Sequence, residues 1–223
     1  FKTIIIAKPT KEFLDIDKYL IDQYIMSGGK TLWLLDGTSA NMNNFGNNFE
    51  FQIEKNQLLL EEYLSIYGAK VNHDLIQDER CSKSPMIFNN DVAYVDWPYN
   101  PVLFTTKNHI ITSKEDSILT NFVSSIEILK PNKTTVLLSS SDKSNVINEG
   151  ENVHLDIIKN PPKKFEGKKT VAVVIEDEFT SAFSHLELST KLKMKTKSKQ
   201  NKMIIISDGD IISNLHSPPN FYY

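Results

Sequence analysis

Polar side chains follow several apolar stretches of this sequence, at the points where β-strands are expected to end. The candidates for a binding site are Asp36, Ser140, Glu176, Asp208 and Asp210. If these strands are parallel, their carboxyl ends meet at one edge of a sheet, where open α/β sheets place their binding crevice. Carboxylate oxygens suit a divalent metal, and the same cluster would suit a sugar. Strand ends are polar in most α/β proteins, so an ordinary solvated edge is the alternative interpretation.

The clearest structural signal lies in residues 3–37. Residues 3–7 form a short β-branched apolar run, which is typical of a strand buried on both faces. Apolar residues then recur at helical spacing from Ile16 to Ile25, with Asp15 as the expected N-cap and Gly28-Gly29 as the expected end. Residues 31–35 form a second apolar run. Strand, helix and strand in this order predict a right-handed crossover between two parallel strands.

The rest of the chain predicts further strands and helices of an α/β fold. Buried strands are expected at 70–76, 134–138, 170–175 and 203–206, a helix capped by Asn56, and a short helix at 179–183. Prolines and short apolar runs after Cys81 favour hairpins. The prediction is one domain, residues 1–223, with a mostly parallel sheet flanked by helices and a β-rich insertion at about 81–115.

Catalytic motifs are absent from the sequence. Cys81 lacks the strand-to-helix turn of a nucleophile elbow, the five histidines are scattered, and neither G-x-G-x-x-G nor the Walker pattern occurs. Gly28-Gly29-Lys30 ends a helix, so it does not present N–H groups to a phosphate. We therefore expect no enzyme activity, no cofactor and no histidine or cysteine metal site.

Composition narrows the possible partners. The net charge of −3 gives no general attraction to nucleic acid, and one cysteine excludes an intramolecular disulfide. No apolar run approaches the roughly eighteen residues of a membrane span. The sequence begins at Phe1, inside an expected strand and without Met, so we expect it to be a fragment of a longer protein.

Three features could form contact surfaces. Trp97 and Tyr99, near the end of the expected insertion, would bind a sugar or a protein partner if exposed, or would pack on the main sheet. The asparagine-rich residues 38–48 indicate a loop, either solvated or ligand-binding. A lysine-rich tract that includes Lys193, Lys195 and Lys197 is either a solvated loop or edge strand, or a contact for anionic headgroups or an acidic partner.

The sequence also resembles a known family. Residues 21–37, which read IDQYIMSGGKTLWLLDG, and residues 202–210, which read KMIIISDGD, are similar to segments of the gliding-motility-associated auxiliary protein of an ABC transporter, the GldG family. The resemblance continues in a consistent order at residues 67–68, 75–78, 122–126, 133–139 and 179–183.

This resemblance implies a function and a location. The family's sheet domain is similar to domains of intraflagellar-transport proteins and to flavodoxin-like or glutamine-amidotransferase-like α/β folds without their catalytic cysteine. It implies a domain on the periplasmic face of the inner membrane, tethered by transmembrane segments, beside the permease and ATPase subunits of a transporter linked to gliding motility or secretion. Envelope or gliding-machinery proteins are further expected partners.

Three hypotheses follow. The leading one is a non-enzymatic auxiliary domain that acts through protein–protein contacts. The second is a solute-binding domain that holds a sugar or small anion at the strand ends. The third is an unrecognised hydrolase that uses the same carboxylates, which requires a carboxylate of strongly raised pKa in a cleft.

Overall fold

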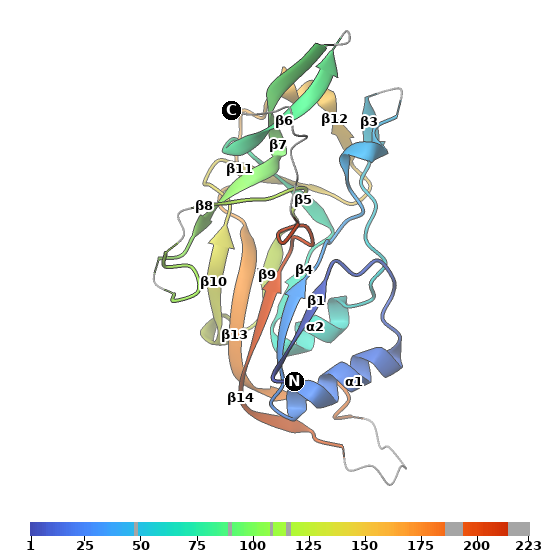
Figure 1. Cartoon of the computed structure of the whole chain (residues 1–223), viewed down its shortest axis with the longest axis vertical. Coiled ribbons are helices and arrows are strands. Elements are labelled where there is room, and N and C mark those ends of the chain that lie inside the picture. Colours follow the sequence, from blue (N-terminus) through green and yellow to red (C-terminus); the bar gives the residue numbers. More distant parts are fainter. Residues whose placement is uncertain (47–48, 89–90, 108, 115–116, 186–193, 214–223) are drawn as a thin grey trace.

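The centre of the protein is an eight-stranded mixed sheet (Figure 1). The computed structural model describes residues 1–46, 49–88, 91–107, 109–114, 117–185 and 194–213. Seven strands lie in the order β1-β2-β14-β13-β10-β7-β6, and β8 pairs with β7. In that order their bounds are Thr3–Ala7, Lys30–Leu34, Lys197–Ile206, Thr170–Thr180, Thr134–Ser139, Asp91–Thr105 and Cys81–Phe88, with β8 at Ser117–Leu119.

The predicted fold class is wrong. The β1–β2 and β2–β14 pairs are parallel, whereas β13 pairs antiparallel with both β14 and β10. Strands make up 43% of the chain and helices 15%, so the protein is mostly β and not a helix-flanked parallel α/β fold. The apolar run at residues 171–175 misled the prediction. It is fully buried because β13 is central and covered on both faces, and such burial does not depend on strand direction.

The predicted crossover at the N-terminal end is present, but β1 is not a buried strand. β1 and β2 are parallel, with Thr3 opposite Lys30 and Ala7 opposite Leu34. β1 lies at the edge of the sheet, and exposed and half-buried residues alternate along it. Ile5 is 63% exposed because the outer layer that a doubly wound fold would supply is missing there.

Both α-helices of the described chain lie on the same face of the sheet. α1, Asp15–Met26, and α2, Glu61–Tyr67, cover a core around Trp33. Leu14, not Asp15, is the N-cap of α1, and the Asp17 carboxylate accepts a hydrogen bond from the Leu14 N–H at 3.1 Å. Gly28, at φ 94°, ends the helix as expected, since glycine adopts this conformation without steric cost.

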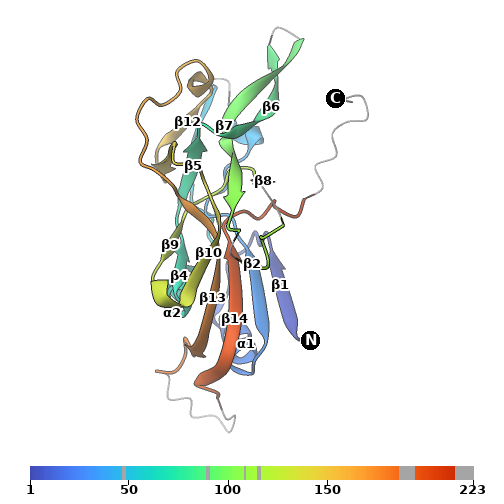
Figure 2. The same cartoon turned by 90° about the vertical axis from the view of Figure 1, so that its left-hand side faces the viewer.

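Short antiparallel strand pairs build the upper part of the molecule and the rest of the helical layer. β3 (Glu50–Gln52) pairs with β12 (Asn152–His154), β4 (Ala69–Val71) with β9 (Ile126–Ile128), and β5 (Asp74–Asp78) with β11 (Ser144–Asn148). The 3₁₀ turns are η1, η2 and η3, at Met42–Asn44, Pro131–Lys133 and Leu155–Ile158. Figure 2 shows β4, β9 and α2 together on one side of the main sheet.

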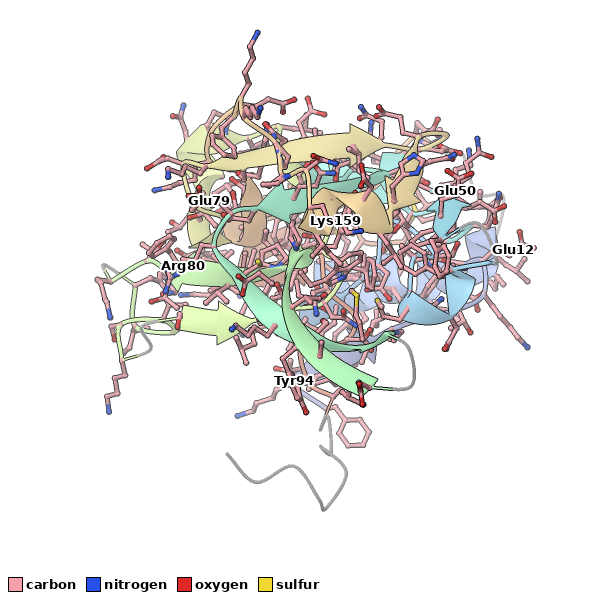
Figure 3. All side chains as sticks on the ribbon, turned by 90° about the horizontal axis from the view of Figure 1, so that it is seen from above. Glu12, Glu50, Glu79, Arg80, Tyr94 and Lys159 are labelled. Atoms are coloured by element: carbon pink, nitrogen blue, oxygen red, sulfur yellow. The ribbon has the colours of Figure 1, made fainter. Side chains whose placement is uncertain are left out.

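The expected hairpin after Cys81 is formed by β6 and β7, with Met86 opposite Ala93. Figure 3 shows this hairpin from above, with Tyr94 near its end. Its inner surface packs on a second core, which the sequence pattern did not predict as a separate cluster. The buried members of that core are Phe51, Ile53, Leu75, Met86, Trp97, Tyr99, Phe122 and Val153. That this segment is an insertion into a single domain stays a prediction.

Two helix predictions fail. Residues 179–183 continue β13 as far as Thr180 and then form a turn, because the 179–180 backbone pairs with β14. Asn56 does not cap α2, which begins at Glu61. Its side-chain amide instead donates to the Asp36 carbonyl oxygen at 3.3 Å, so it supports the segment that follows β2.

A buried carboxylate connects the helical layer to the sheet. Asp22, on α1, is 0% exposed, although in the sequence it is one of the polar residues between the apolar positions of this helix. It accepts hydrogen bonds from the Tyr67 hydroxyl at 2.7 Å, the Ser181 hydroxyl at 2.7 Å and the Ala182 N–H at 2.8 Å. These partners place α1 against α2 and against the turn that follows β13.

No helix within the described residues is both long enough and apolar enough to span a membrane.

Replacement of Asp22 by Ala should lower the free energy of unfolding by about 3 kcal/mol or more, because it leaves three buried donors, on α2 and on the turn after β13, without an acceptor. Asp15→Ala is the matched control on the same helix, since the Asp15 side chain is 94% exposed and should cost less than about 0.5 kcal/mol. Urea unfolding of both variants measures the difference. Equal losses would show that the Asp22 network does not hold the helical layer in place.

Candidate functional site

The parallel strands β1, β2 and β14 end at the same edge of the sheet, and each is followed by a charged residue. Lys8 follows β1, Asp36 comes shortly after β2, and Asp208 and Asp210 come shortly after β14. The backbone keeps the three segments together, since the Lys8 N–H donates to the Leu34 carbonyl oxygen and the Leu35 N–H to the Ile206 carbonyl oxygen, both at 2.9 Å. The predicted meeting of Asp36, Asp208 and Asp210 is therefore present, and we call these residues with Lys8 the carboxylate cluster.

Close contacts within the cluster leave little space between its side chains. The Gly209 N–H donates to Asp36 Oδ1 at 2.6 Å. Lys8 Nζ lies 2.5 Å from Asp210 Oδ2 and 3.7 Å from Asp36 Oδ2. A Cβ atom on Gly209 would lie 2.9 Å from the Asp36 carboxylate and 3.0 Å from the Lys8 side chain. Glycine is required at 209 because the two chain segments approach each other this closely.

Asp208 has the most perturbed electrostatic environment of the cluster. It is 0% exposed, and its Oδ1 accepts a hydrogen bond from the Asp210 N–H at 2.8 Å. Burial raises the pKa of Asp208 to about 7; the Asp210 N–H opposes this shift and the nearby Asp36 carboxylate adds to it. Burial also raises the pKa of Asp36, although the Gly209 N–H and the Lys8 ammonium lower it.

The cluster does not form an open ligand site. Within the described residues, no group of three or more histidine, cysteine, aspartate or glutamate side chains is arranged to hold a metal ion. The hollow that adjoins Asp36 lies against Asn56, Glu61 and His73 and has a cavity volume of about 20 Å³, which is room for roughly one water molecule. The protein's own lysine and backbone N–H groups occupy the positions that a ligand would need.

Glu176 and Ser140 do not join the cluster. Glu176 lies on β13, which runs antiparallel to β14, and it pairs with Lys202 at 2.5 Å. Ser140 follows β10 and is 0% exposed. Its hydroxyl oxygen lies 2.7 Å from the Ser144 hydroxyl oxygen and accepts a hydrogen bond from the Lys169 N–H at 2.7 Å. Both residues serve local structure in the positions that they occupy here.

The two aromatic residues proposed for partner binding are buried. Trp97 is 0% exposed and Tyr99 is 1% exposed. Trp97 packs edge-on against Phe45, and Tyr99 stacks on Phe122 with ring centroids 6.1 Å apart. The Tyr99 hydroxyl accepts a hydrogen bond from the Gln77 amide at 2.7 Å. The alternative prediction was that these rings pack on the main sheet; the structure places both in the second core.

The three lysines proposed for partner binding differ in their surroundings. Lys193 lies outside the described residues. The Lys195 backbone N–H donates to the Gln23 side chain at 2.9 Å, and its ammonium donates to the Ser27 hydroxyl at 3.0 Å. Lys197 is exposed at the first position of β14. That these lysines bind a partner stays a prediction.

Sequence reasoning missed Lys8, the cation of the cluster. The signal was present, because Lys8 follows its strand directly in the same way that acidic residues follow β2 and β14. The prediction considered only carboxylates and hydroxyls at strand ends. It therefore did not foresee that a cation would neutralise them.

The raised pKa of Asp208 predicts a pH-dependent stability. Native Asp208 keeps its proton up to about pH 7, whereas an unperturbed aspartate loses it near 3.8. Between these values the folded state binds more protons than the unfolded state, so the free energy of unfolding should fall as pH rises. The contribution of Asp208 is at most about 4 kcal/mol.

Asp208→Asn should flatten the pH dependence of the melting temperature between about pH 4 and pH 7. Asp15→Asn, at an exposed position on α1, should keep the wild-type slope. If wild type and Asp208→Asn show the same slope, Asp208 does not hold a proton in the folded state at these pH values.

Comparisons with known proteins assign a family. The mmIFT52 N-terminal domain, a solved structure, is similar with a TM-score of 0.51 and 14% identity over 94% of this chain and 67% of that chain; this likeness shows the fold alone. No curated protein matches the sequence. A family model described as "ABC-type uncharacterized transport system" matches residues 1–221. Because this match spans nearly the whole chain, the protein belongs to that family and is an auxiliary component of an ABC-type transport system.

Proposed function

We propose that this protein is a non-enzymatic auxiliary domain that acts through protein–protein contacts with the permease and ATPase subunits of its transporter. Its location is the periplasmic face of the inner membrane, with membrane tethers outside this sequence, and the transport is linked to gliding motility or secretion. Family membership supports a role beside a transporter. The finer features, gliding and location, come from the resemblance of residues 21–37 and 202–210 to the gliding-motility protein.

The state of the carboxylate cluster is the observation that favours a contact function over catalysis or solute binding. Lys8 forms ion pairs with both Asp36 and Asp210, Asp208 is inaccessible, and the adjoining hollow has room for roughly one water molecule. A general acid or base must reach its substrate, and a sugar must be enclosed on several sides. The cluster meets neither requirement, so it acts as a clasp between the segments after β1, β2 and β14.

An exposed apolar surface on α1 supplies a place for a protein contact. Leu14, Ile16 and Leu20 are 56%, 58% and 61% exposed, and we call them the α1 surface. Ile16 and Leu20 are one helical turn apart and so lie on the same side of α1. Contiguous exposed apolar surface is a mark of protein interaction sites, so the α1 surface is our candidate for the contact.

Substitution of the α1 surface tests this function. Ile16→Lys with Leu20→Lys should abolish co-purification of the protein with its permease and ATPase subunits, because two charges would be buried in the contact. The control exchanges Val92 and Leu119, which are 49% and 67% exposed on other elements, for lysine and should keep co-purification. Failure of the unaltered protein to co-purify with the transporter would contradict the proposed function, and equal behaviour of both variants would exclude the α1 surface.

A thermal-shift screen tests the solute-binding alternative. A ligand at about one hundred times its dissociation constant adds roughly 2.7 kcal/mol, which would raise the melting temperature by about 5–10 °C. We expect sugars, nucleotides, small anions and divalent metals to leave it within about 1 °C, because the cluster is closed. A reproducible shift that Asp36→Ala removes would restore the solute-binding function.

A further inference from the structure

Lysines from distant parts of the sequence gather at one end of the molecule. Lys2 and Lys30 lie at the starts of β1 and β2, and the Lys30 N–H donates to the Lys2 carbonyl oxygen at 3.1 Å. On β14, Met203 lies opposite Thr31, so Lys202 is beside Lys30 across the sheet. Lys197 and Lys199 lie further toward the start of the same strand. We call these five residues the basal lysines.

The sheet is shaped so that this end projects. β14 pairs with β2 only from Met203 onward, whereas its first half pairs with β13 alone. The paired ends of β13 and β14 therefore extend below the other strands (Figures 1 and 2). The β6–β7 hairpin lies at the opposite end of the long axis (Figure 1).

The five basal lysines outnumber the three acidic residues of β13 and β14, in a chain whose net charge is −3. Within these two strands, as described, the acidic residues are Glu176, Asp177 and Glu178, all on β13. Asp177 is already paired with Lys133 at 3.2 Å, and Glu176 with Lys202. Lys2, Lys30, Lys197 and Lys199 are all exposed, so cationic charge dominates this surface.

We propose that the basal lysines are a docking surface for an anionic phospholipid bilayer, which the protein contacts end-on. Ammonium groups spread over a convex end match the diffuse negative potential of a lipid surface, where each lysine adds about 1 kcal/mol. A partner protein with defined carboxylates would instead favour arginine, whose planar fork binds them bidentately. The only arginine of the chain, Arg80, lies far from this end, with its guanidinium 3.9 Å from the centre of the Phe104 ring.

The positions of the hollows in the described structure favour a lipid surface over an acidic peptide as the partner. The best-formed ones lie beside α1, α2, η3 and the segment after β5, and none is lined by a basal lysine. A specific acidic peptide would be held in a groove that fixes its side chains. A bilayer needs only a charged, sterically accessible surface.

Vesicle flotation tests the proposal with the whole chain. The protein should float with vesicles that contain about one-third phosphatidylglycerol and not with pure phosphatidylcholine. Binding should weaken as salt rises from about 0.05 to 0.5 M, because the charges are screened. Absence of binding to the anionic vesicles at low salt would overturn the proposal.

Two matched variants locate the surface. Lys30→Glu, Lys197→Glu and Lys199→Glu together should weaken vesicle binding by about 100-fold or more. The control triple reverses three exposed lysines on other segments, Lys83, Lys159 and Lys163, with the same change in net charge. It should keep most of the binding. Equal losses in the two triples would show a net-charge effect and overturn the proposal.

Two further measurements exclude a folding defect in the variant and a general affinity for acidic macromolecules as explanations. Glutamine at positions 30, 197 and 199 removes the charge without reversing it and should also weaken binding, which covers the case in which the glutamate triple does not fold. Poly-glutamate added to the vesicles serves as an acidic polypeptide competitor. If it displaces the protein at the same charge concentration as the lipid, the surface recognises acidic macromolecules in general and the lipid assignment is wrong.

Discussion

The position of the helical layer depends on one buried carboxylate. Asp22 accepts hydrogen bonds from α2 and from the turn after β13, and it is itself part of α1. A buried charge is tolerated only when such donors surround it, so these three segments must stay together. Tyr67 and Phe179 then pack edge to face beneath the helices, with ring centroids 5.5 Å apart. The Asp22 network therefore joins both helices to the turn after β13, on the one face of the sheet that the described helices cover.

At the carboxyl ends of β1, β2 and β14, the carboxylate cluster also holds chain segments together. The parallel directions of β1, β2 and β14 bring Asp36, Asp208 and Asp210 together, as they would in a ligand site. Lys8 and the Gly209 N–H neutralise the accessible oxygens, and burial keeps Asp208 protonated toward neutral pH. An arrangement that predicts ligand binding from residue types is thus a clasp between chain segments. Because the cluster is closed, our functional proposals concern the surface of the protein and not this cluster.

The surfaces of this auxiliary transport component are chemically separate. The α1 surface is apolar and lies on the helical layer, while the basal lysines lie at the starts of β1 and β2 and on β14. A protein contact and a lipid contact could therefore be made at the same time without competing for the same residues. Such a division suits a domain that works beside a membrane-embedded transporter.

The sequence by itself determined the local features. The β1–α1–β2 crossover, the helix end at Gly28 and the β6–β7 hairpin were predictable because spacing and turn residues within a few tens of positions specify them. The family resemblance also followed from local segments. The meeting of Asp36, Asp208 and Asp210 was predictable because it needs only that their strands share a direction.

Only the tertiary structure decided the strand directions, the second core and the side-chain clusters, because these features depend on contacts between residues far apart in the chain. Lys8 and Asp210 are 202 positions apart, and Asp22 and Ser181 are 159 apart. No local pattern reports that Asp22 is buried, that Trp97 lies in a second core, or that β13 runs antiparallel to both neighbours. The apolar run of β13 agrees with its cover on both faces, but the direction of this strand is set by the strands that pair with it.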